Sequence, residues 1–206
     1  MSTKLKISRN KLILVEGADA YWFLIWALKA YSIEDVQVMD FGGNPDLFLF
    51  IKTLKNLDNF DLVTSIIIAR DAETDHTAAF SSVTAALKNN GLSVPDILFS
   101  YKDGNPKIAV MLFPGYDQNG NIENGCLEHL CLKTINDKTI ETTEKYLKDV
   151  NESHEKLTHE HKSKLHAYLS VKNKFVGSKL GEAANYGAWD WLAPSLIPFK
   201  ETIENS

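Results

Sequence analysis

Five acidic residues follow two short apolar runs in the first half of the chain. They are Glu16 and Asp19 after the first run, and Asp71, Glu73 and Asp75 after the second. Carboxylates crowded together repel one another and raise each other's pKa, so a persistent cluster needs a cation. Mg²⁺ takes carboxylate oxygens and keeps several waters, and two acids with the spacing of Asp71 and Glu73 point the same way in extended backbone. The pattern predicts a site for Mg²⁺ or Mn²⁺.

Acids that follow strands often cap the next helix instead of binding a ligand. We interpret Asp19 and Asp75 in this way and keep them as secondary site candidates. Glu16 differs because Glu is a poor N-cap. The adjacent Gly17 indicates that the backbone turns sharply or approaches another group closely, although a plain turn explains it equally well.

The segments around these acids alternate between strand-like and helix-like patterns. Apolar or β-branched runs at 11–15, 36–41 and 63–69 predict strands, and segments at 21–30, 47–57 and 77–90 predict helices. Three such pairs in series predict an α/β fold with a mainly parallel sheet flanked by helices. The carboxyl ends of parallel strands share one edge, so the acids should converge there.

Two further strands are predicted at 97–101 and 108–113, as a hairpin at the edge of the sheet, and the order of the strands is not readable. From residue 125 onward, helical spacing predicts helices near 125–132, 137–150, 154–172 and 178–187. We therefore divide the chain into an α/β core over 1–124 and a helical extension over 125–206, packed together as one globular unit. Trp189 and Trp191 should pack against the core rather than stack on bases. Only residues 201–206 look loose.

Composition excludes several classes of protein. The chain has 206 residues, a net charge of −5, no apolar run long enough for a membrane span and no signal-like start, so we expect a cytoplasmic protein without membrane contact. The negative charge argues against a simple DNA-binding module.

Cys126 and Cys131 match no common zinc spacing, and the six histidines lie mainly in the predicted C-terminal helices, so we expect packing cysteines and no zinc. No glycine-rich nucleotide-binding motif is present, which disfavours a flavodoxin-like or Rossmann-like nucleotide binder.

The order of three motifs along the chain resembles the Toprim domain of topoisomerases, bacterial primases and small nucleases. The motifs are Leu14–Asp19 (LVEGAD), Gly42-Gly43, and Ile66–Glu73 (IIIARDAE). The resemblance implies a Toprim-like, Rossmann-like fold, with Glu16 as the catalytic glutamate and Asp71 and Glu73 as Mg²⁺ ligands. Glu73 stands where that family usually has a second aspartate.

The rest of the chain is similar to stand-alone prokaryotic Toprim proteins and, more distantly, to the Toprim nuclease part of OLD-family proteins. The strings are Gly125–Glu128 (GCLE) and His161–Tyr168 (HKSKLHAY). The resemblance implies that Glu128 joins the metal site and that Lys164, or next Lys162, faces the scissile phosphate. The alternative for both is a solvated charge on a helix.

These resemblances imply Mg²⁺-dependent phosphoryl transfer, most simply hydrolysis of a phosphodiester in RNA or DNA by a nuclease. Topoisomerase and primase activities are disfavoured because the chain lacks the further domains that they need. A local phosphate-binding patch could come from six C-terminal lysines, Lys156, Lys162, Lys164, Lys172, Lys174 and Lys179. The alternative is a regulatory protein that binds a metal or a nucleotide without turnover, which the acidic net charge favours. The sequence leaves open whether the chain forms a homodimer.

Overall fold

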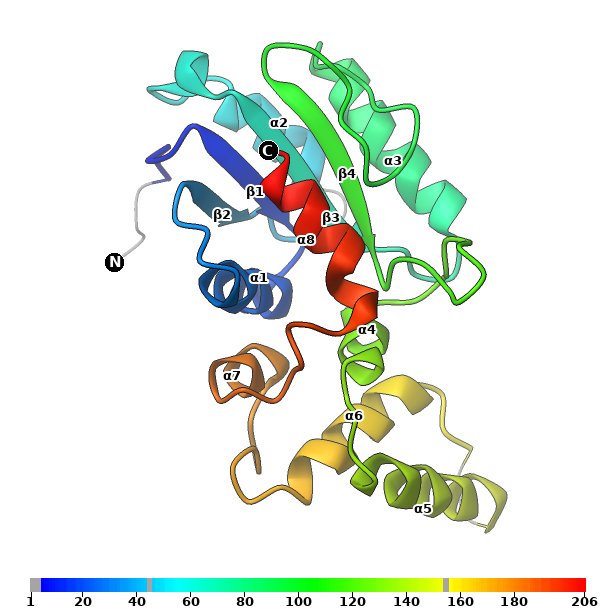
Figure 1. Cartoon of the computed structure of the whole chain (residues 1–206). Helices are drawn as coiled ribbons and strands as arrows, with labels where there is room; N and C mark the ends of the chain where they lie inside the picture. Colours follow the sequence, from blue (N-terminus) through cyan, green and yellow to red (C-terminus); the bar gives the residue numbers. More distant parts are fainter. Residues whose placement is uncertain (1–4, 44–45, 154–155) are drawn as a thin grey trace.

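Four parallel strands form one sheet in the order β2-β1-β3-β4 (Figure 1). The structure is a computed structural model that describes residues 5–43, 46–153 and 156–206. The strands are β1 (Lys11–Val15), β2 (Val36–Asp40), β3 (Ser65–Asp71) and β4 (Lys107–Phe113). The prediction of a parallel sheet flanked by helices is confirmed. Residues 44 and 45, between the predicted strand at 36–41 and the predicted helix at 47–57, and residues 154 and 155, the predicted start of a helix, lie outside the described residues.

Helices cover both faces of the sheet, as its nearly continuous apolar strands require. One face carries α1 (Ala18–Ala30) and α8 (Ile197–Glu204), and the other carries α2 (Leu47–Leu54) and α3 (His76–Asn89) (Figure 1). Alternate strand residues point to opposite faces, so Ile13 and Ile67 face α1 whereas Leu12 and Ile66 face α2 and α3. Short 3-10 helices also occur, at Phe60–Leu62 and at Pro194–Leu196.

The chain reverses its direction across the sheet between β1 and β3. It passes from β1 outward to β2, returns past β1 to β3, and continues outward to β4. In open parallel sheets, ligands bind outside the carboxyl ends of the strands at such a reversal. The strand order, which the sequence did not reveal, therefore marks the space beyond β1 and β3 as the place to look for a site.

The C-terminal third is helical, as predicted, and it packs on α1 and on the end of the sheet. Its helices are α4 (Leu127–Lys133), α5 (Thr139–Ser153), α6 (Glu160–Ser170), α7 (Leu180–Asn185) and α8. In the part of the chain that the structure describes, no helix combines the length and the apolar character that a bilayer span needs.

The end of the chain is well packed, so the prediction that residues 201–206 are loose is wrong. Helix α8 lies across the sheet, and the Phe199 ring stacks on the Phe113 ring with the ring centres 5.4 Å apart. Ile203 is buried in the same apolar cluster. Trp189 is also buried and Trp191 contacts Phe23, which confirms that these tryptophans serve packing.

Two predicted strands differ from the structure. Residues 97–101 form no strand; the Phe99 N–H donates to the Val110 carbonyl, and Lys102 forms an isolated bridge with Ile108. Phe99 has a positive φ of 58°, which breaks a regular strand. Strand β3 instead extends farther than predicted, so that Asp71 is its last residue rather than part of the following loop.

Close packing of α7 on α1 yields a test of the fold. A Cβ atom at Gly181 would lie 2.5 Å from the Trp22 Cβ, near the helix backbone. We expect Gly181→Ala to lower the free energy of unfolding by about 1–3 kcal/mol, because the overpacking outweighs the better helix propensity of Ala. Chemical denaturation measures the change. Asn185→Ala, at an exposed position of the same helix, is the control, and equal stabilities of the two variants would contradict the packing.

Candidate functional site

The ends of β1 and β3 bring Glu16 and Asp71 to the same edge of the sheet. Glu16 continues the pairing beyond β1, because its N–H donates to the Ala69 carbonyl of β3 at 3.3 Å. Beyond β3, the Ala72 N–H donates to the Phe113 carbonyl of β4 at 2.9 Å. The convergence that the sequence predicted thus follows from strand pairing at the reversal point.

Asp71 is a strongly perturbed carboxyl group at this edge. Its Oδ1 accepts a hydrogen bond from the Leu127 N–H at the start of α4, at 2.9 Å. Burial raises the pKa of Asp71 to about 7; the Leu127 hydrogen bond opposes the rise, and the charges of Glu128, Glu73 and Glu16 add to it. Asp71, Glu73, Glu128 and Glu16 are therefore close enough to affect one another. None of these influences on the pKa of Asp71 comes from a positively charged side chain.

Glu16 is held by a buried arginine. The Arg70 Nε lies 3.2 Å from the Glu16 Oε2, and the Arg70 side chain is only 4% exposed. Arg70 comes from β3, next to Asp71, so the same strand supplies one acid and the cation that balances another. A fixed guanidinium both orients the Glu16 carboxylate and offsets part of the charge at the edge.

The turns after β1 and β2 are joined by Asp40, a carboxylate that the sequence analysis did not single out. Its Oδ1 accepts hydrogen bonds from the Gly17 N–H at 2.9 Å and the Gly42 N–H at 2.8 Å. Gly17 has a φ of 85° and no atom within 4 Å of an added Cβ. Glycine is therefore needed there for a sharp turn and not for a close approach.

Glu73 does not lie in extended backbone. Its φ is 55°, in the left-handed region, and its N–H donates to the Gly125 carbonyl at 2.7 Å. The prediction that Asp71 and Glu73 point the same way because the backbone is extended is therefore wrong in its geometry. A non-glycine residue in this conformation costs of order 1 kcal/mol and is typical of functional sites. Glu73 is exposed, whereas Asp71 is partly buried.

Glu128 lies at the start of α4 and pairs with α6. Its Oε1 is 3.6 Å from the Lys162 Nζ. Burial alone would raise the pKa of Glu128, but the Cys126 hydrogen bond, its own backbone N–H and the charges of Lys162 and His161 together lower it below the ordinary value. Lys164, in contrast, forms an ion pair with Glu144 of α5. Of the two candidate lysines, the structure brings Lys162 to the acidic edge.

The two secondary candidates, Asp19 and Asp75, have structural roles, but only Asp75 caps a helix as predicted, because α1 has no side-chain cap. Asp75 caps α3, because its Oδ1 accepts hydrogen bonds from the Thr77 and Ala78 N–H groups. The Asp19 Oδ1 accepts a hydrogen bond from the Gly181 N–H at 3.3 Å and thereby ties α1 to α7.

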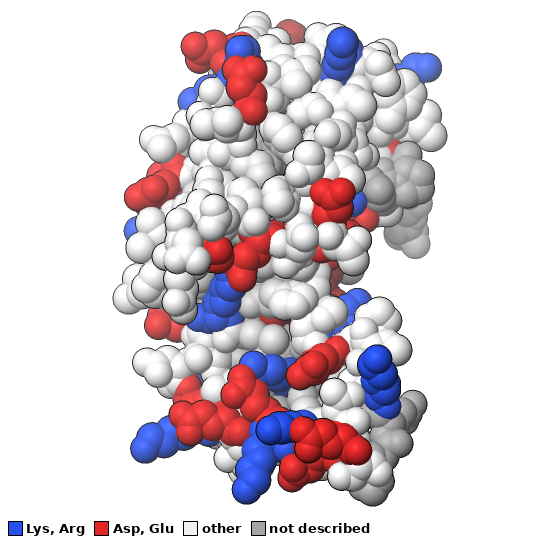
Figure 2. Space-filling view, turned by 90° about the vertical axis from the view of Figure 1, so that its right-hand side faces the viewer, with Lys and Arg blue, Asp and Glu red and all other residues white. Residues whose placement is uncertain are grey.

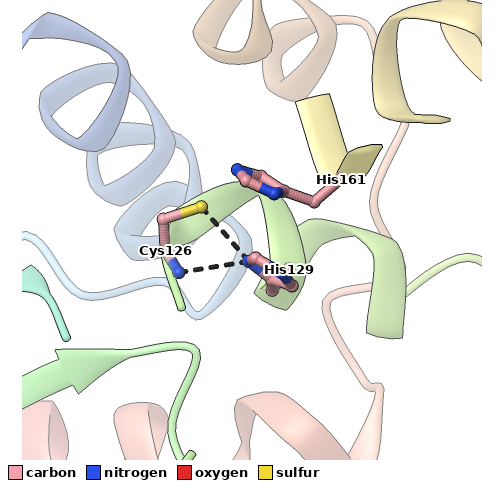
Figure 3. A group of neighbouring side chains, drawn as sticks. All are labelled: Cys126, His129 and His161. Carbon is pink, nitrogen blue, oxygen red and sulfur yellow. Dashed lines mark hydrogen bonds between the residues drawn. The ribbon is translucent and has the colours of Figure 1, made fainter. Parts of the chain in front are cut away.

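Sequence reasoning missed a group of nitrogen and sulfur ligands beside the acids. Cys126, His129 and His161 each offer a ligand atom, and these atoms lie within 4.8 Å of one another. Figure 3 shows Cys126 and His129 at the start of α4, with the His161 ring from α6 stacked over His129. The prediction that the chain offers no set of histidine and cysteine ligands is therefore wrong. The spacing Cys-x-x-His at 126–129 was a local signal for two neighbouring ligands. Nothing in the sequence indicated that His161 would join them.

Among the described residues, no other group of three His, Cys, Asp or Glu side chains has its ligand atoms this close together. The carboxylates of the acidic edge therefore affect one another electrostatically without forming a tight cage. Mg²⁺ does not require such a cage, because it is usually held through one or two carboxylates and keeps several of its waters.

The surface is hollowed between the sheet and the C-terminal helices. Figure 2 shows an indentation between the upper part of the molecule, which holds the sheet, and the lower part, which holds the C-terminal helices. Positive charge on the helices is partly neutralised, because Lys162, Lys164 and Lys172 pair with Glu128, Glu144 and Asp137. Lys156, Lys174 and Lys179 are exposed.

The pKa of Asp71 predicts a pH-dependent stability. A carboxyl group whose pKa rises to about 7 on folding destabilises the fold increasingly as the pH rises from about 4 to 7. In chelator, we expect Asp71→Asn to gain up to about 3 kcal/mol of stability relative to the original protein between about pH 5 and pH 8, since one pKa unit corresponds to about 1.4 kcal/mol. Denaturation at both pH values measures this difference. Asp103→Asn, at an exposed position, should show no such trend. If the free energy of unfolding of the Asp71 variant and of the original protein changed equally between the two pH values, the shifted pKa would be contradicted.

Comparison with known proteins places the chain in one family and gives no activity. The family described as "Protein of unknown function (DUF3226)" matches residues 10–206. Neither a curated protein nor a solved structure matches the chain. The match spans the whole sheet, the acidic edge and all the C-terminal helices. The chain therefore belongs to the DUF3226 family.

Proposed function

We propose that the acidic edge binds Mg²⁺ or Mn²⁺ and that the chain hydrolyses phosphodiester bonds in RNA or DNA. The observation that carries the proposal is Asp71, a partly buried carboxyl group at the reversal point of the sheet, with its pKa raised to about 7 by burial and by three further acids. Groups with strongly shifted pKa values at such positions mark functional sites. Resemblance to the Toprim domain supports the choice of metal and reaction.

The residues present fit a divalent metal ion. Asp71 accepts its hydrogen bond at Oδ1, and its electrostatic neighbours are carboxylates, so the site offers hard oxygen donors and an excess of negative charge. One or two of Asp71, Glu73 and Glu128 would hold the ion directly, and the other acids of the edge, Glu16 included, would contact it through its bound waters. The ion would supply positive charge to the oxygens of the phosphate.

The chain's own groups can carry out the remaining steps. Glu16, oriented by Arg70, can accept a proton from the attacking water as the general base. Lys162 lies at the acidic edge and is half exposed, so it can approach a phosphate and stabilise the leaving oxygen. Lys164 is the alternative for this role; its pairing with Glu144 would have to open first.

A specific observation also favours a regulatory protein. The net charge is −5, and three of the six lysines in the candidate patch are paired with acids. A nuclease for long nucleic acids ordinarily presents unpaired positive charge along its substrate. Binding of a metal ion or a nucleotide without turnover is therefore the second candidate function.

Calorimetric titration of Mg²⁺ and Mn²⁺ tests metal binding, and incubation with mixed RNA and DNA substrates tests turnover. We expect the original protein to bind one of these ions and to cleave. Asp71→Asn keeps the acceptor for the Leu127 N–H but loses the charge, so it should lose at least about tenfold in metal affinity and most of the cleavage. Asp75→Asn removes an acid of the same loop that serves only as a helix cap, and it is the matched control.

The outcomes separate the two candidate functions. If the protein binds a metal ion but cleaves neither RNA nor DNA, the regulatory function is favoured. If neither ion binds to the folded original protein, the metal proposal fails, and if the Asp75 variant loses as much as the Asp71 variant, the site has been placed wrongly.

The two lysines can be distinguished by a paired substitution. We expect Lys162→Ala to reduce kcat about 100-fold or more while Mg²⁺ binding persists, because charge stabilisation by a positioned cation typically contributes this much. Lys164→Ala should reduce kcat much less, since its partner in the structure is Glu144 of α5. Steady-state cleavage rates and calorimetry on both variants give the comparison, and the reverse ranking would assign the role to Lys164.

A further inference from the structure

Two helices meet at Cys126, His129 and His161. Cys126 and His129 lie one turn apart at the start of α4, whereas His161 comes from the first turn of α6. The Cys126 Sγ is 3.2 Å from the His129 Nδ1, and the His129 and His161 ring centres are 4.2 Å apart. All three ligand atoms lie within 4.8 Å of one another (Figure 3).

We propose that Cys126, His129 and His161 bind a Zn²⁺ ion, as a second metal site that differs in its chemistry from the acidic edge. Zn²⁺ prefers thiolate sulfur and imidazole nitrogen, whereas Mg²⁺ prefers oxygen. Three protein ligands leave the fourth tetrahedral position to water, which is the composition of catalytic rather than structural zinc sites. This inference stands independently of the nuclease proposal.

Ligand distances are close to those that a tetrahedral site needs. With Zn–S near 2.3 Å and Zn–N near 2.0 Å, a sulfur and a nitrogen ligand are separated by about 3.5 Å. The Cys126 and His129 atoms already meet this requirement. The His161 nitrogen lies within 4.8 Å of both atoms, so a rotation of its partly exposed side chain can complete the site. Binding displaces the thiol proton of Cys126 to solvent and leaves both imidazoles neutral. The His129 Nδ1 has one lone pair, so its bond to the ion replaces the hydrogen bond from the Cys126 N–H.

Helix capping explains only part of this arrangement. The Cys126 N–H donates to the His129 Nδ1 at 3.2 Å, so His129 helps to cap α4. The Cys126 side chain takes part in the same capping box, so capping accounts for the closeness of Cys126 and His129. Capping does not account for the second imidazole, which His161 brings from α6.

The position of the site suggests what the ion does. On each helix, a proposed Zn²⁺ ligand is adjacent in sequence to a residue that lies at the acidic edge. On α4, His129 follows Glu128, and on α6, Lys162 follows His161. Glu128 and Lys162 form an ion pair between the two helices. A Zn²⁺ ion joining α4 to α6 would hold this pair in place and couple the two metal sites.

Co²⁺ titration of the reduced, chelator-treated full chain tests the proposal. Co²⁺ takes the same ligands as Zn²⁺, and its bond to a thiolate gives an absorption band in the near ultraviolet. We expect one equivalent of Co²⁺ to produce this band, Zn²⁺ to abolish it, and an excess of Mg²⁺ to leave it unchanged. Saturation with Zn²⁺ should also raise Tm by about 5 °C or more, as expected for binding to the folded state alone.

Matched variants identify the ligands. Cys126→Ser should lose the thiolate band, and His161→Ala should weaken Co²⁺ binding at least about tenfold. Cys131→Ala changes the other cysteine, which lies in the core, and His166→Ala changes an exposed histidine of the same helix. Both should retain the band and the affinity. Circular dichroism tests whether each variant is folded. If Cys126→Ser does not fold, the Co²⁺ affinity of His161→Ala tests the site instead.

Three results would overturn the proposal. The first is the absence of a thiolate band in the folded original protein. The second is a band that survives Cys126→Ser but disappears in Cys131→Ala. The third is equal Co²⁺ affinity in the His161 and His166 variants, which would exclude the ligand from α6.

Discussion

The hydrogen bond from the Leu127 N–H to the Asp71 carboxylate joins the two parts of the molecule at the site. Asp71 ends the central strand β3, and Leu127 begins α4, the first helix of the C-terminal third. Glu73 adds a second link through the Gly125 carbonyl. Because α4 is held at the edge of the sheet, Glu128, Cys126 and His129 are brought to the acids that follow the strands. The contact therefore places the start of α4 beside the carboxyl end of β3, so that residues of both elements form the candidate site.

Charge at this edge is only partly balanced within the chain. Arg70 offsets Glu16, and Lys162 offsets Glu128, but burial and the nearby acids hold the pKa of Asp71 near 7. An arrangement of this kind weakens the fold when the carboxyl group ionises. A bound cation would reverse that effect, which is why we associate the imbalance with metal binding and not with stability.

The two candidate metal sites are adjacent and chemically different. Oxygen donors follow the strands, whereas sulfur and nitrogen donors come from α4 and α6. Glu128 lies between them, since it is an acid of the edge and also affects the pKa values of Cys126, His129 and His161. A change at one site would therefore be felt at the other through α4.

Local patterns in the sequence determined the elements and the first ligands. The run at 11–15 became β1 without change, and the acids Glu16 and Asp71 were recognisable because they follow buried strands. The segment at 97–101 was misjudged because a positive φ at Phe99 is not visible in apolar spacing, and residues 201–206 were misjudged because their burial depends on the distant β4. Strand order, the left-handed Glu73 and the meeting of His161 with Cys126 were decided by tertiary structure alone. These features arise from contacts between residues far apart in the chain, whereas hydrophobic periodicity reports only on neighbours.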